Sequence, residues 1–404
     1  MSKGNLLIYA PVPLYQSDDG YLLEDQACNG LRLWAENFDT VTVMIPLGHG
    51  SPPTSWKPVD IVGPNLARVR FVPLPMSYRP DVFFKNYRSC RDIIRQEIDK
   101  ADYMSFSIGG LFGDWGSVAC YQAHRRQRRF AIWTDRVESE VVRRTASSGR
   151  LKERTKARLT HRPMAWLERF LIRRATIGLF HGKETFDTYA PFCRQPILVH
   201  DIHIGKAEHI SVDRLARKIS AISDGPLKIG YVGRADPMKG PLDWVATLAK
   251  LAKSGTAFEA FWMGEGTEMD AMRAQAQAQG IADKIKFLGF VKDREEVLEK
   301  YRAADIFLFC HKTPESPRCL IEALVSGTPI VGYEGAFARD LISKHNGGRL
   351  VSLGEIDALV AQLEKLAQDR AMMAVMMAGA VKDGAPYDDV SVFAHRSNVI
   401  KDYL

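Results

Sequence analysis

Short apolar runs, each followed by a longer stretch with helical spacing, recur along most of this chain. In the first half the runs predict β-strands at Leu6–Ala10, Val41–Ile45, Arg68–Val72, Tyr103–Ile108, Phe130–Thr134, Ile177–His181 and Ile197–His200. The stretches between them include Tyr21–Asn37 and Asn86–Asp99, which read as helices. Such alternation predicts a parallel, doubly wound α/β sheet.

The same alternation returns after residue 226. The predicted strands are Leu227–Val232, Glu259–Met263, Ile285–Phe287, Ile306–Cys310, Pro329–Gly332 and Arg349–Val351. The predicted helices are Gly240–Lys253, Met269–Gln279, Arg294–Ala303, Pro317–Val325, Phe337–Ser343 and Ile356–Gln368. We therefore expect a second domain of the same α/β class.

The length of 404 residues suits two domains of ordinary size. We place the N-terminal domain at residues 1–205 and an interdomain linker at 206–226, which contains the turn cluster Ser223–Pro226. The second domain takes residues 227–385. Residues 386–404 form a C-terminal helix that can cross back to the N-terminal domain.

The composition indicates a soluble globular protein, with 46% hydrophobic and 25% charged residues. No apolar run approaches the roughly 18 residues that a membrane span requires. The apolar segment near the start is too short for a signal peptide, and we interpret it as the first strand. The six cysteines show neither CxxC nor a metal-ligand spacing, so we expect a reducing cytoplasmic location and no metal site.

The net charge of +7 is concentrated in one block. Between Arg125 and Arg174 there are sixteen Arg and Lys against five Asp and Glu, which leaves a net −4 for the rest of the chain. The end of this block, Pro163–Arg174, has an apolar face and a basic face. It fits a docked surface helix, a helix at an anionic membrane surface, or, less well, a nucleic-acid-binding segment.

The stretch Thr313–Leu324 lies between two predicted strands, at a strand-to-helix turn. We predict Ser316 as the N-cap and Pro317 as the first helical residue. The amides at such a helix start, with Arg318 beside them, can bind an anion. Glu315 and Glu322 flank this site, so a nucleotide-sugar would find donors for its diphosphate and acceptors for its hydroxyls.

The second domain opens with a strand that runs into Gly233 and Arg234, with Lys239 five residues further on. Arg234 and Lys239 can meet one diphosphate, and Gly233 allows the backbone to approach it closely. The spacing matches neither a dinucleotide fingerprint nor a P-loop.

In a doubly wound sheet, ligands bind beyond the carboxyl ends of the strands. For the first domain, this rule places the binding wall at Pro11–Tyr21, Gly109–Gly116 and Thr134–Glu138.

The ordered motifs of the second domain closely resemble the retaining glycosyltransferases of family 4, a branch of the glycosyl transferases group 1. The resemblance is carried by Gly233–Gly240, Met263–Gly266, Leu288–Val291, Ala304–Leu308, Glu315–Leu324 and Ser326–Val331. It is strong over Leu227–Leu366 and covers the first domain only in its order of strands and helices. It implies the GT-B architecture: two facing Rossmann-like domains with an interdomain cleft.

The resemblance also implies roles for the residues. Arg234 and Lys239 would hold the donor diphosphate and stabilise the departing nucleotide. Glu322 would bind the ribose hydroxyls, and Glu315 those of the donor sugar. The remaining donor-binding positions would be Gly233, the backbone of Phe290 and Val291 against the base, and the helix start at Ser316, Arg318, Cys319 and Leu320 against the phosphates.

In two places the sequence departs from the family pattern. The two glutamates are separated by six residues, where the family usually has seven. The family often has a histidine at the end of a first-domain strand, and Asp135 stands at the comparable position. Asp135 could hold a sugar hydroxyl, help to remove the acceptor proton, or simply pair with a neighbouring arginine. His181 and His203 are further candidates, although a histidine at a strand end is usually structural.

Together these features predict a retaining glycosyltransferase that uses a nucleotide-diphosphate-sugar, needs no metal or other cofactor, and does not bind nucleic acid. The basic block 125–174 suggests an anionic or membrane-borne acceptor, such as a lipid or lipid-linked saccharide, and peripheral contact with the inner face of a membrane. The alternatives are a nucleotide-sugar epimerase or hydrolase of the same architecture and a non-catalytic binding protein.

Overall fold

The computed structural model describes residues 3–18, 20–53, 56–59, 64–148, 151–222, 225–313 and 315–404, with the side chains of 64, 65, 145–148, 152 and 153 excepted. Parts of the predicted linker (Ser223 and Asp224) and of the predicted anion-binding stretch (Pro314) therefore lie outside the described residues. The contacts divide the chain into two units. Unit 1 comprises Met1–His203, Pro314–Ser316 and Asp389–Leu404, and unit 2 comprises Ile204–Thr313 and Pro317–Asp388.

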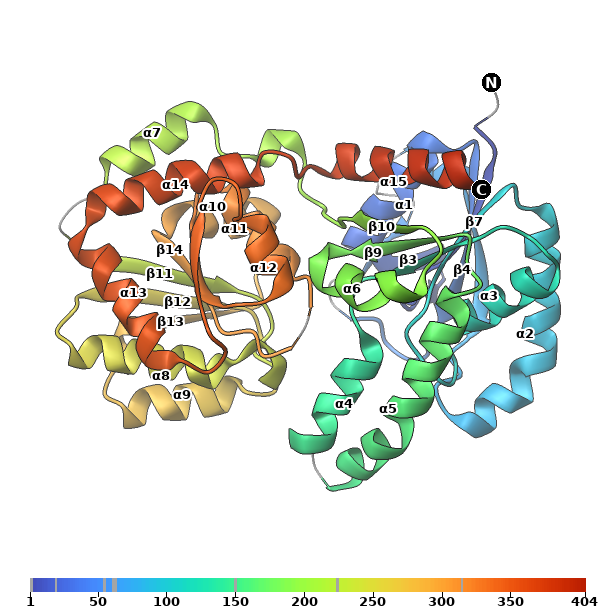
Figure 1. Ribbon diagram of the computed structural model, residues 1–404, viewed down its shortest axis with the longest axis horizontal. Coiled ribbons are helices and arrows are strands. Elements are labelled where there is room, and N and C mark those ends of the chain that lie inside the picture. Colours follow the sequence, from blue (N-terminus) through green and yellow to red (C-terminus); the bar gives the residue numbers. More distant parts are fainter. Residues whose placement is uncertain are drawn as a thin grey trace. The chain divides into compact units, whose positions relative to one another are not determined.

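Unit 1 is built on a parallel sheet whose described strands run in the order β10-β9-β8-β7-β1-β4-β6 (Figure 1). The strand bounds are β1 Asn5–Tyr9, β4 Thr40–Leu47, β6 Val69–Pro75, β7 Tyr103–Ser107, β8 Ala131–Thr134, β9 Ile177–His181 and β10 Pro196–Val199. The chain order reverses between β1 and β7. A second, antiparallel sheet joins β2 Tyr15–Ser17, β3 Gly20–Glu24 and β5 Trp56–Pro58.

The described helices of unit 1 are α1 Asp25–Asn37, α2 Pro80–Lys100, α3 Trp115–Arg125, α4 Glu138–Ser148, α5 Leu151–Ile172, α6 Gly182–Tyr189 and α15 Asp389–Tyr403. The last of these packs against α1 and β7. Helices α4 and α5 pack against each other, and Figure 1 shows them as a pair whose far ends project beyond the sheet of this unit.

Unit 2 has a parallel sheet whose described strands run in the order β13-β12-β11-β14-β15-β16. The bounds are β11 Leu227–Val232, β12 Phe258–Met263, β13 Ile285–Gly289, β14 Ile306–Phe309, β15 Ile330–Tyr333 and β16 Gly348–Val351. Numbered within the unit, the order is that of a Rossmann sheet, with its switch point between β11 and β14.

The described helices of unit 2 are α7 Val212–Ser220, α8 Pro241–Lys253, α9 Met269–Ala278, α10 Arg294–Ala303, α11 Arg318–Val325, α12 Ala336–Leu341, α13 Ile356–Gln368 and α14 Arg370–Gly384. Helix α7 lies within residues 206–226, which we assigned to a linker. The predicted fold class, two Rossmann-like doubly wound parallel-sheet domains, is confirmed.

One predicted helix has the wrong start, and helix α14 was not predicted. The helix expected at Tyr21–Asn37 begins only at Asp25, because Gly20–Glu24 forms β3, paired with β2 and β5. Glu24 then caps α1 by accepting a hydrogen bond from the Ala27 amide. Helix α14 was missed because its apolar residues lie on all sides rather than along one stripe.

The buried sheet face of unit 2 is organised around one aromatic stack. The Tyr231 ring packs on Trp262 with the centroids 3.9 Å apart, and on Phe307 at 5.3 Å. All three side chains are buried. The stack joins the three neighbouring strands β12, β11 and β14.

Unit 1 contains a buried ion pair between Arg396 of α15 and Asp201. The Arg396 Nη1 lies 3.0 Å from the Asp201 Oδ1, and the Arg396 side chain is only 6% exposed. Its guanidinium also lies over the rings of Trp34 and Trp133, at 4.8 and 5.2 Å. Burial lowers the pKa of Arg396, against the effect of Asp201.

None of the helices in the described residues is long and apolar enough to cross a membrane.

We expect Arg396→Ala to lower the free energy of unfolding by about 3–5 kcal/mol, because it removes a buried guanidinium from the largely buried Asp201 carboxylate. Urea titration followed by circular dichroism would measure the loss. Arg88→Ala, on the exposed face of α2, is the matched control and should change stability by less than about 0.5 kcal/mol. Equal effects of the two substitutions would contradict this assignment.

Candidate functional site

At the carboxyl edge of the unit 2 sheet, the turns that follow neighbouring strands pack with their backbones in direct contact. The amide of Gly233 donates to the Met263 carbonyl at 2.9 Å, and the amide of Gly264 donates to the Gly289 carbonyl at 2.8 Å. Gly264 has a φ of +134°, and a Cβ at this position would lie 2.2 Å from the Gly233 oxygen. Only glycine permits this approach.

The loop after β14 joins the same edge. Gly240 has a φ of +63°, and a Cβ there would lie 2.0 Å from the Cys310 carbonyl oxygen. The Lys312 amide donates to the Met238 carbonyl at 2.8 Å. The motif at Gly233–Gly240 and the start of the loop after β14 therefore meet at the switch point of this sheet, where the topology predicts a ligand site.

The two predicted diphosphate ligands lie on this edge. Arg234 is exposed, and its Nη1 forms an ion pair with Asp236 at 3.1 Å. Lys239 ends the short helix η5 (Pro237–Lys239). Burial, and then the charge of Lys239, lower the pKa of His311 well below its usual value. The imidazole is therefore neutral at neutral pH.

Several polar residues at this edge were missed by sequence reasoning. The Tyr231 hydroxyl and the His311 Nε2 are 2.8 Å apart. Asp243 accepts hydrogen bonds from the Lys312 Nζ at 2.7 Å and the Tyr333 hydroxyl at 2.9 Å. His311 and Lys312 directly follow the apolar run Ile306–Cys310, and this position was the signal that could have identified them.

Glu322 of α11 is 8% exposed and has two partners that we did not predict. Its Oε1 accepts from Arg294 at 2.8 Å and its Oε2 from the Tyr301 hydroxyl at 3.0 Å. Burial alone would lower the pKa of Arg294, but the nearby carboxylates of Glu322 and Glu208 have the larger effect, so its pKa is raised. Each carboxylate oxygen of Glu322 can accept a further hydrogen bond, so a contact with the ribose remains a prediction.

The other predicted donor-binding residues of unit 2 lie on two elements. Phe290 directly follows β13 and its side chain is exposed, whereas Val291 is half-buried. Arg318 and Cys319 are half-buried in the first turn of α11, and Leu320 is buried.

The prediction that Ser316 caps α11 was wrong. The helix begins at Arg318 with Pro317 as its N-cap, and no side chain caps it. The Ser316 hydroxyl instead donates to the His181 carbonyl at 2.8 Å, and the Ser316 carbonyl lies 3.0 Å from the His181 Nε2. The His181 Nδ1 accepts from the Asp201 amide at 3.0 Å, so Nε2 carries the proton. His181 is therefore a buried structural residue that holds Ser316 within unit 1.

Asp135 and Glu315, both predicted as catalytic, lie near one guanidinium in unit 1. Arg136 forms an isolated antiparallel β-bridge with Glu315. The Arg136 Nε donates to the Glu138 Oε1 at 2.6 Å. Burial acts to lower the pKa of Arg136, but the charges of Glu138, Asp135 and Glu315 outweigh it and raise that pKa.

Glu138 is the acidic residue of this group that sequence reasoning passed over. Burial raises its pKa, Arg136 opposes the rise, and Asp135 adds to it. A Cβ on Gly109 would lie 3.1 Å from the Glu138 Cγ, so two of the predicted wall segments, Gly109–Gly116 and Thr134–Glu138, are adjacent. A carboxyl with a raised pKa at such an edge is a candidate proton acceptor.

We expect Gly264→Ala to destabilise the protein by at least about 2 kcal/mol more than Gly20→Ala. The two glycines have similar φ values of +134° and +129°, but a Cβ on Gly20 meets nothing within 4 Å, whereas one on Gly264 overlaps the Gly233 carbonyl. The difference therefore separates the backbone contact from the cost of the backbone angle. Thermal unfolding of both variants would measure it, and equal melting temperatures would show that the contact is unimportant.

Comparisons with known proteins give a consistent assignment. Residues 212–383 match the family model described as Glycosyl transferases group 1. The 2-deoxystreptamine N-acetyl-D-glucosaminyltransferase of Streptomyces fradiae is 29% identical over 56% of this chain and 55% of its own length. The phosphatidyl-myo-inositol mannosyltransferase of Mycolicibacterium smegmatis is 30% identical over 42% and 46%. The chain thus spans about half the length of the curated relatives it matches.

Solved structures extend the likeness of fold to the whole chain. HepE from Anabaena, solved in complex with UDP, aligns with a TM-score of 0.69 at 15% identity, over 99% of this chain and 100% of its own. A glycosyltransferase from Rickettsia africae aligns with a TM-score of 0.65 at 13% identity, over 100% and 99%. The chain therefore has the GT-B fold, and its residues 212–383 match the family model of the glycosyl transferases group 1.

Proposed function

We propose that this protein is a retaining glycosyltransferase of family 4 that moves a sugar from a nucleotide-diphosphate-sugar to an acceptor. The observation that carries the proposal is the edge at the unit 2 switch point, where tightly packed turns hold Arg234 and Lys239 on the loop after β11. The matched family model covers this edge. HepE from Anabaena has been solved with UDP and also with UDP-glucose, which supports a nucleotide-diphosphate-sugar as the donor.

The chemistry needs a place for developing negative charge. As the bond between the anomeric carbon and the diphosphate oxygen breaks, charge accumulates on the diphosphate, where Arg234, Lys239 and the first-turn amides of α11 would stabilise it. The acceptor oxygen forms its bond on the same face of the sugar, and its proton passes to the departing phosphate. This route needs no carboxylate nucleophile and, we propose, no metal or other cofactor.

Three acidic residues then have supporting roles. Glu322 would bind the ribose hydroxyls, and Glu315 the hydroxyls of the donor sugar. Asp135 would hold a sugar hydroxyl or assist removal of the acceptor proton, and Glu138, with its raised pKa, could share the second task.

We further propose that the acceptor is anionic or membrane-borne, and that the protein acts in the cytoplasm at the inner face of the membrane. The excess of positive charge in residues 125–174 supports this. The names of the relatives include both lipid and soluble acceptors, such as phosphatidyl-myo-inositol and 2-deoxystreptamine. The positive charge favours an anionic acceptor of the first kind over a cationic diamine such as 2-deoxystreptamine.

We expect that, in a panel of UDP-, GDP- and ADP-sugars, only the compound with the correct base raises the stability of the protein. At 100 times the dissociation constant the expected gain is about 2.7 kcal/mol, measured as a thermal shift. For Glu322→Gln we expect roughly tenfold weaker binding, so the gain at the same concentration falls to about 1.4 kcal/mol.

The control for this panel is Glu259→Gln, an exposed position on β12, which should keep the full gain. Because Glu322 also pairs with Arg294 and Tyr301, the ligand-free stability of each variant has to be measured first. An undiminished gain in Glu322→Gln would contradict the ribose assignment.

The stereochemistry of transfer tests the mechanism. With the donor identified, proton NMR of the early product should show the anomeric configuration of the donor, because departure and attack take place on one face. An inverted product would contradict retention. Rapid epimer formation or sugar release without any acceptor would favour the epimerase or hydrolase alternative.

A further inference from the structure

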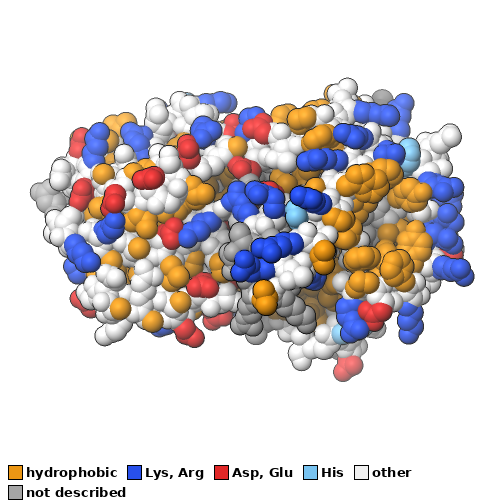
Figure 2. Space-filling model, turned by 60° about the horizontal axis from the view of Figure 1, so that its bottom comes forward, with side chains coloured by type: hydrophobic (Ala, Val, Ile, Leu, Met, Phe, Trp, Pro, Cys, Tyr) orange, Lys and Arg blue, Asp and Glu red, His pale blue; other side chains and the backbone are white. Residues whose placement is uncertain are grey.

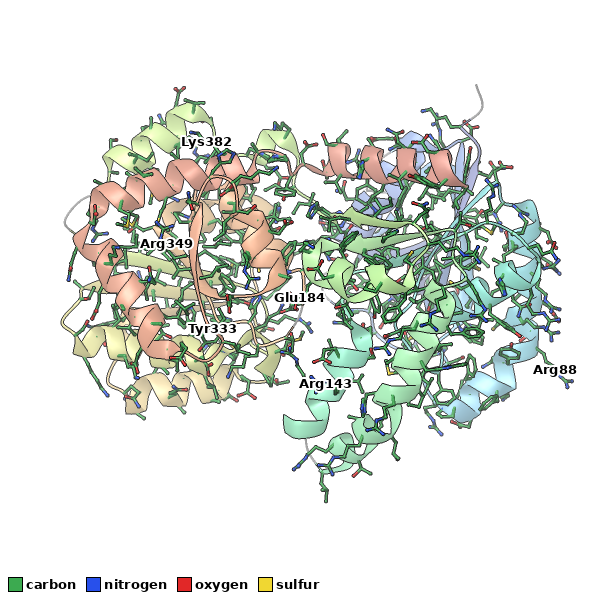
Figure 3. All side chains as sticks on the ribbon, viewed as in Figure 1. Arg88, Arg143, Glu184, Tyr333, Arg349 and Lys382 are labelled. Carbon is green, nitrogen blue, oxygen red and sulfur yellow. The ribbon has the colours of Figure 1, made fainter. Side chains whose placement is uncertain are left out.

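Unit 1 contains a hollow of about 850 Å³ between α4, α5 and α6, remote in sequence from the predicted donor site. It is rich in arginine. Its charged lining consists of Arg143, Arg144, Arg162, Arg169, Arg173 and Arg174 against the carboxylates Glu140, Glu168 and Glu184. Figure 3 labels two of these side chains, Arg143 on α4 and Glu184 on α6.

The shape of the hollow follows from the spacing of residues at the end of α5. Arg162, Ala165, Arg169 and Arg173 are three, four and four residues apart, so they fall on one helical face. Ala165, with its small side chain, lies in the middle of this face and leaves the space above it open. Arg162 precedes it along the helix and Arg169 follows it.

Half of the arginines are already engaged with the protein. Arg143 donates two hydrogen bonds of 2.6 Å to the Glu140 carboxylate, and Arg144 donates one of 3.2 Å to the same carboxylate. Arg174 donates to the Phe170 carbonyl and lies over the Phe170 ring, 3.5 Å from its centroid. These three side chains therefore have partners within the protein.

The other three arginines carry charge that the described residues do not neutralise by direct pairing. Arg162, Arg169 and Arg173 are exposed, and within the described part of the chain no carboxylate forms an ion pair with them. Glu168 lines the same hollow, but it is buried and accepts hydrogen bonds from the Ser139 amide and hydroxyl at 3.0 and 2.6 Å.

Two of these arginines are nevertheless held in place. The guanidinium groups of Arg169 and Arg173 lie over the Phe192 ring, 4.8 and 5.4 Å from its centroid. Like charges four residues apart on a helix repel each other, and a shared anion would remove the repulsion. Two fixed guanidinium forks facing one space match the oxygens of a phosphate group.

An apolar surface adjoins the arginines. Trp166 is 64% exposed and stacks on Phe170 with the ring centroids 5.0 Å apart. Figure 2 shows Lys and Arg side chains gathered beside hydrophobic ones on the face it presents. A ligand with a phosphate and an apolar or ring-shaped portion would use both surfaces.

We infer that this hollow is a binding site for a phosphate group, held by Arg162, Arg169 and Arg173, with the neighbouring part of the ligand against Trp166. The phosphate belongs to a lipid headgroup or to a soluble phosphorylated molecule. Under the proposed function, on which this part of the inference rests, that molecule is the acceptor or the membrane that carries it.

The first arm of the test uses inorganic pyrophosphate and isothermal titration calorimetry on the full chain. Because pyrophosphate can also enter the donor site, the titration is made in the background Arg234→Gln, Lys239→Gln. Adding Arg169→Gln and Arg173→Gln should weaken binding at least tenfold. The matched control, Arg88→Gln on α2, removes an exposed charge of the same unit and should leave the affinity unchanged.

The second arm uses sedimentation with vesicles of phosphatidylcholine, with and without phosphatidylglycerol. Binding only to the anionic vesicles, lost in Arg169→Gln, Arg173→Gln and kept in Arg88→Gln, assigns the phosphate to a lipid headgroup. Pyrophosphate binding without vesicle binding assigns it to a soluble ligand. Lysine substitutions at 169 and 173 should restore only part of the affinity, because lysine lacks the guanidinium fork.

The inference is overturned if neither probe binds, or if Arg88→Gln weakens binding as much as the double substitution, since that would mean general attraction to a basic surface. Thermal unfolding of each variant shows whether it is folded. Failure of the donor panel with success here would remove the glycosyltransferase proposal and leave the phosphate site in place.

Discussion

The candidate site depends on how closely the backbone can pack at the carboxyl edge of the unit 2 sheet. The turns after β11 and β12 touch at Gly233 and Gly264, where a single added Cβ would lie 2.2 Å from a carbonyl oxygen. The turn after β11 meets the end of β14 through Gly240 in the same manner. Since neither contact leaves room for a side chain, the polar groups on these loops, such as Arg234, must project away from the sheet. A surface of loops without intervening side chains is what a diphosphate needs in order to reach backbone amides.

Charge is used in two different ways in this chain. In unit 2, the buried Glu322 accepts a hydrogen bond from the half-buried Arg294, so the pair fixes α11 against α10 at the cost of desolvation. In unit 1, Arg169 and Arg173 are fixed by an aromatic ring rather than by a carboxylate. In the first arrangement the two opposite charges are paired within the protein. The second leaves guanidinium donors facing an open hollow, which is a reason to expect a ligand there and not only a solvated helix.

The sheets were predictable from the sequence, because a strand of a parallel sheet is buried on both faces and reads as an apolar run. Ile177–His181 and Leu227–Val232 were predicted residue for residue. The small sheet of β2, β3 and β5 was missed because its strands are short and partly exposed, so their pattern has no apolar run. The partners of Glu322 could not be foreseen either, since Arg294 and Tyr301 come together with it only through the packing of α10 against α11.

The environment of Ser316 gives the unusual glutamate spacing a physical context. Ser316 is anchored through its hydroxyl and its carbonyl to His181, and the chain then enters α11 one residue later than we predicted. Ser316 is thus held by its side chain and its carbonyl, and the backbone of the preceding Glu315 pairs with Arg136. Arg136 in turn donates a hydrogen bond to Glu138, and the charge of Asp135 helps to raise the pKa of Arg136. A one-residue shift of Glu315 would therefore disturb an entire group of acidic side chains, so the six-residue spacing and the presence of aspartate at position 135 are best understood as parts of one arrangement.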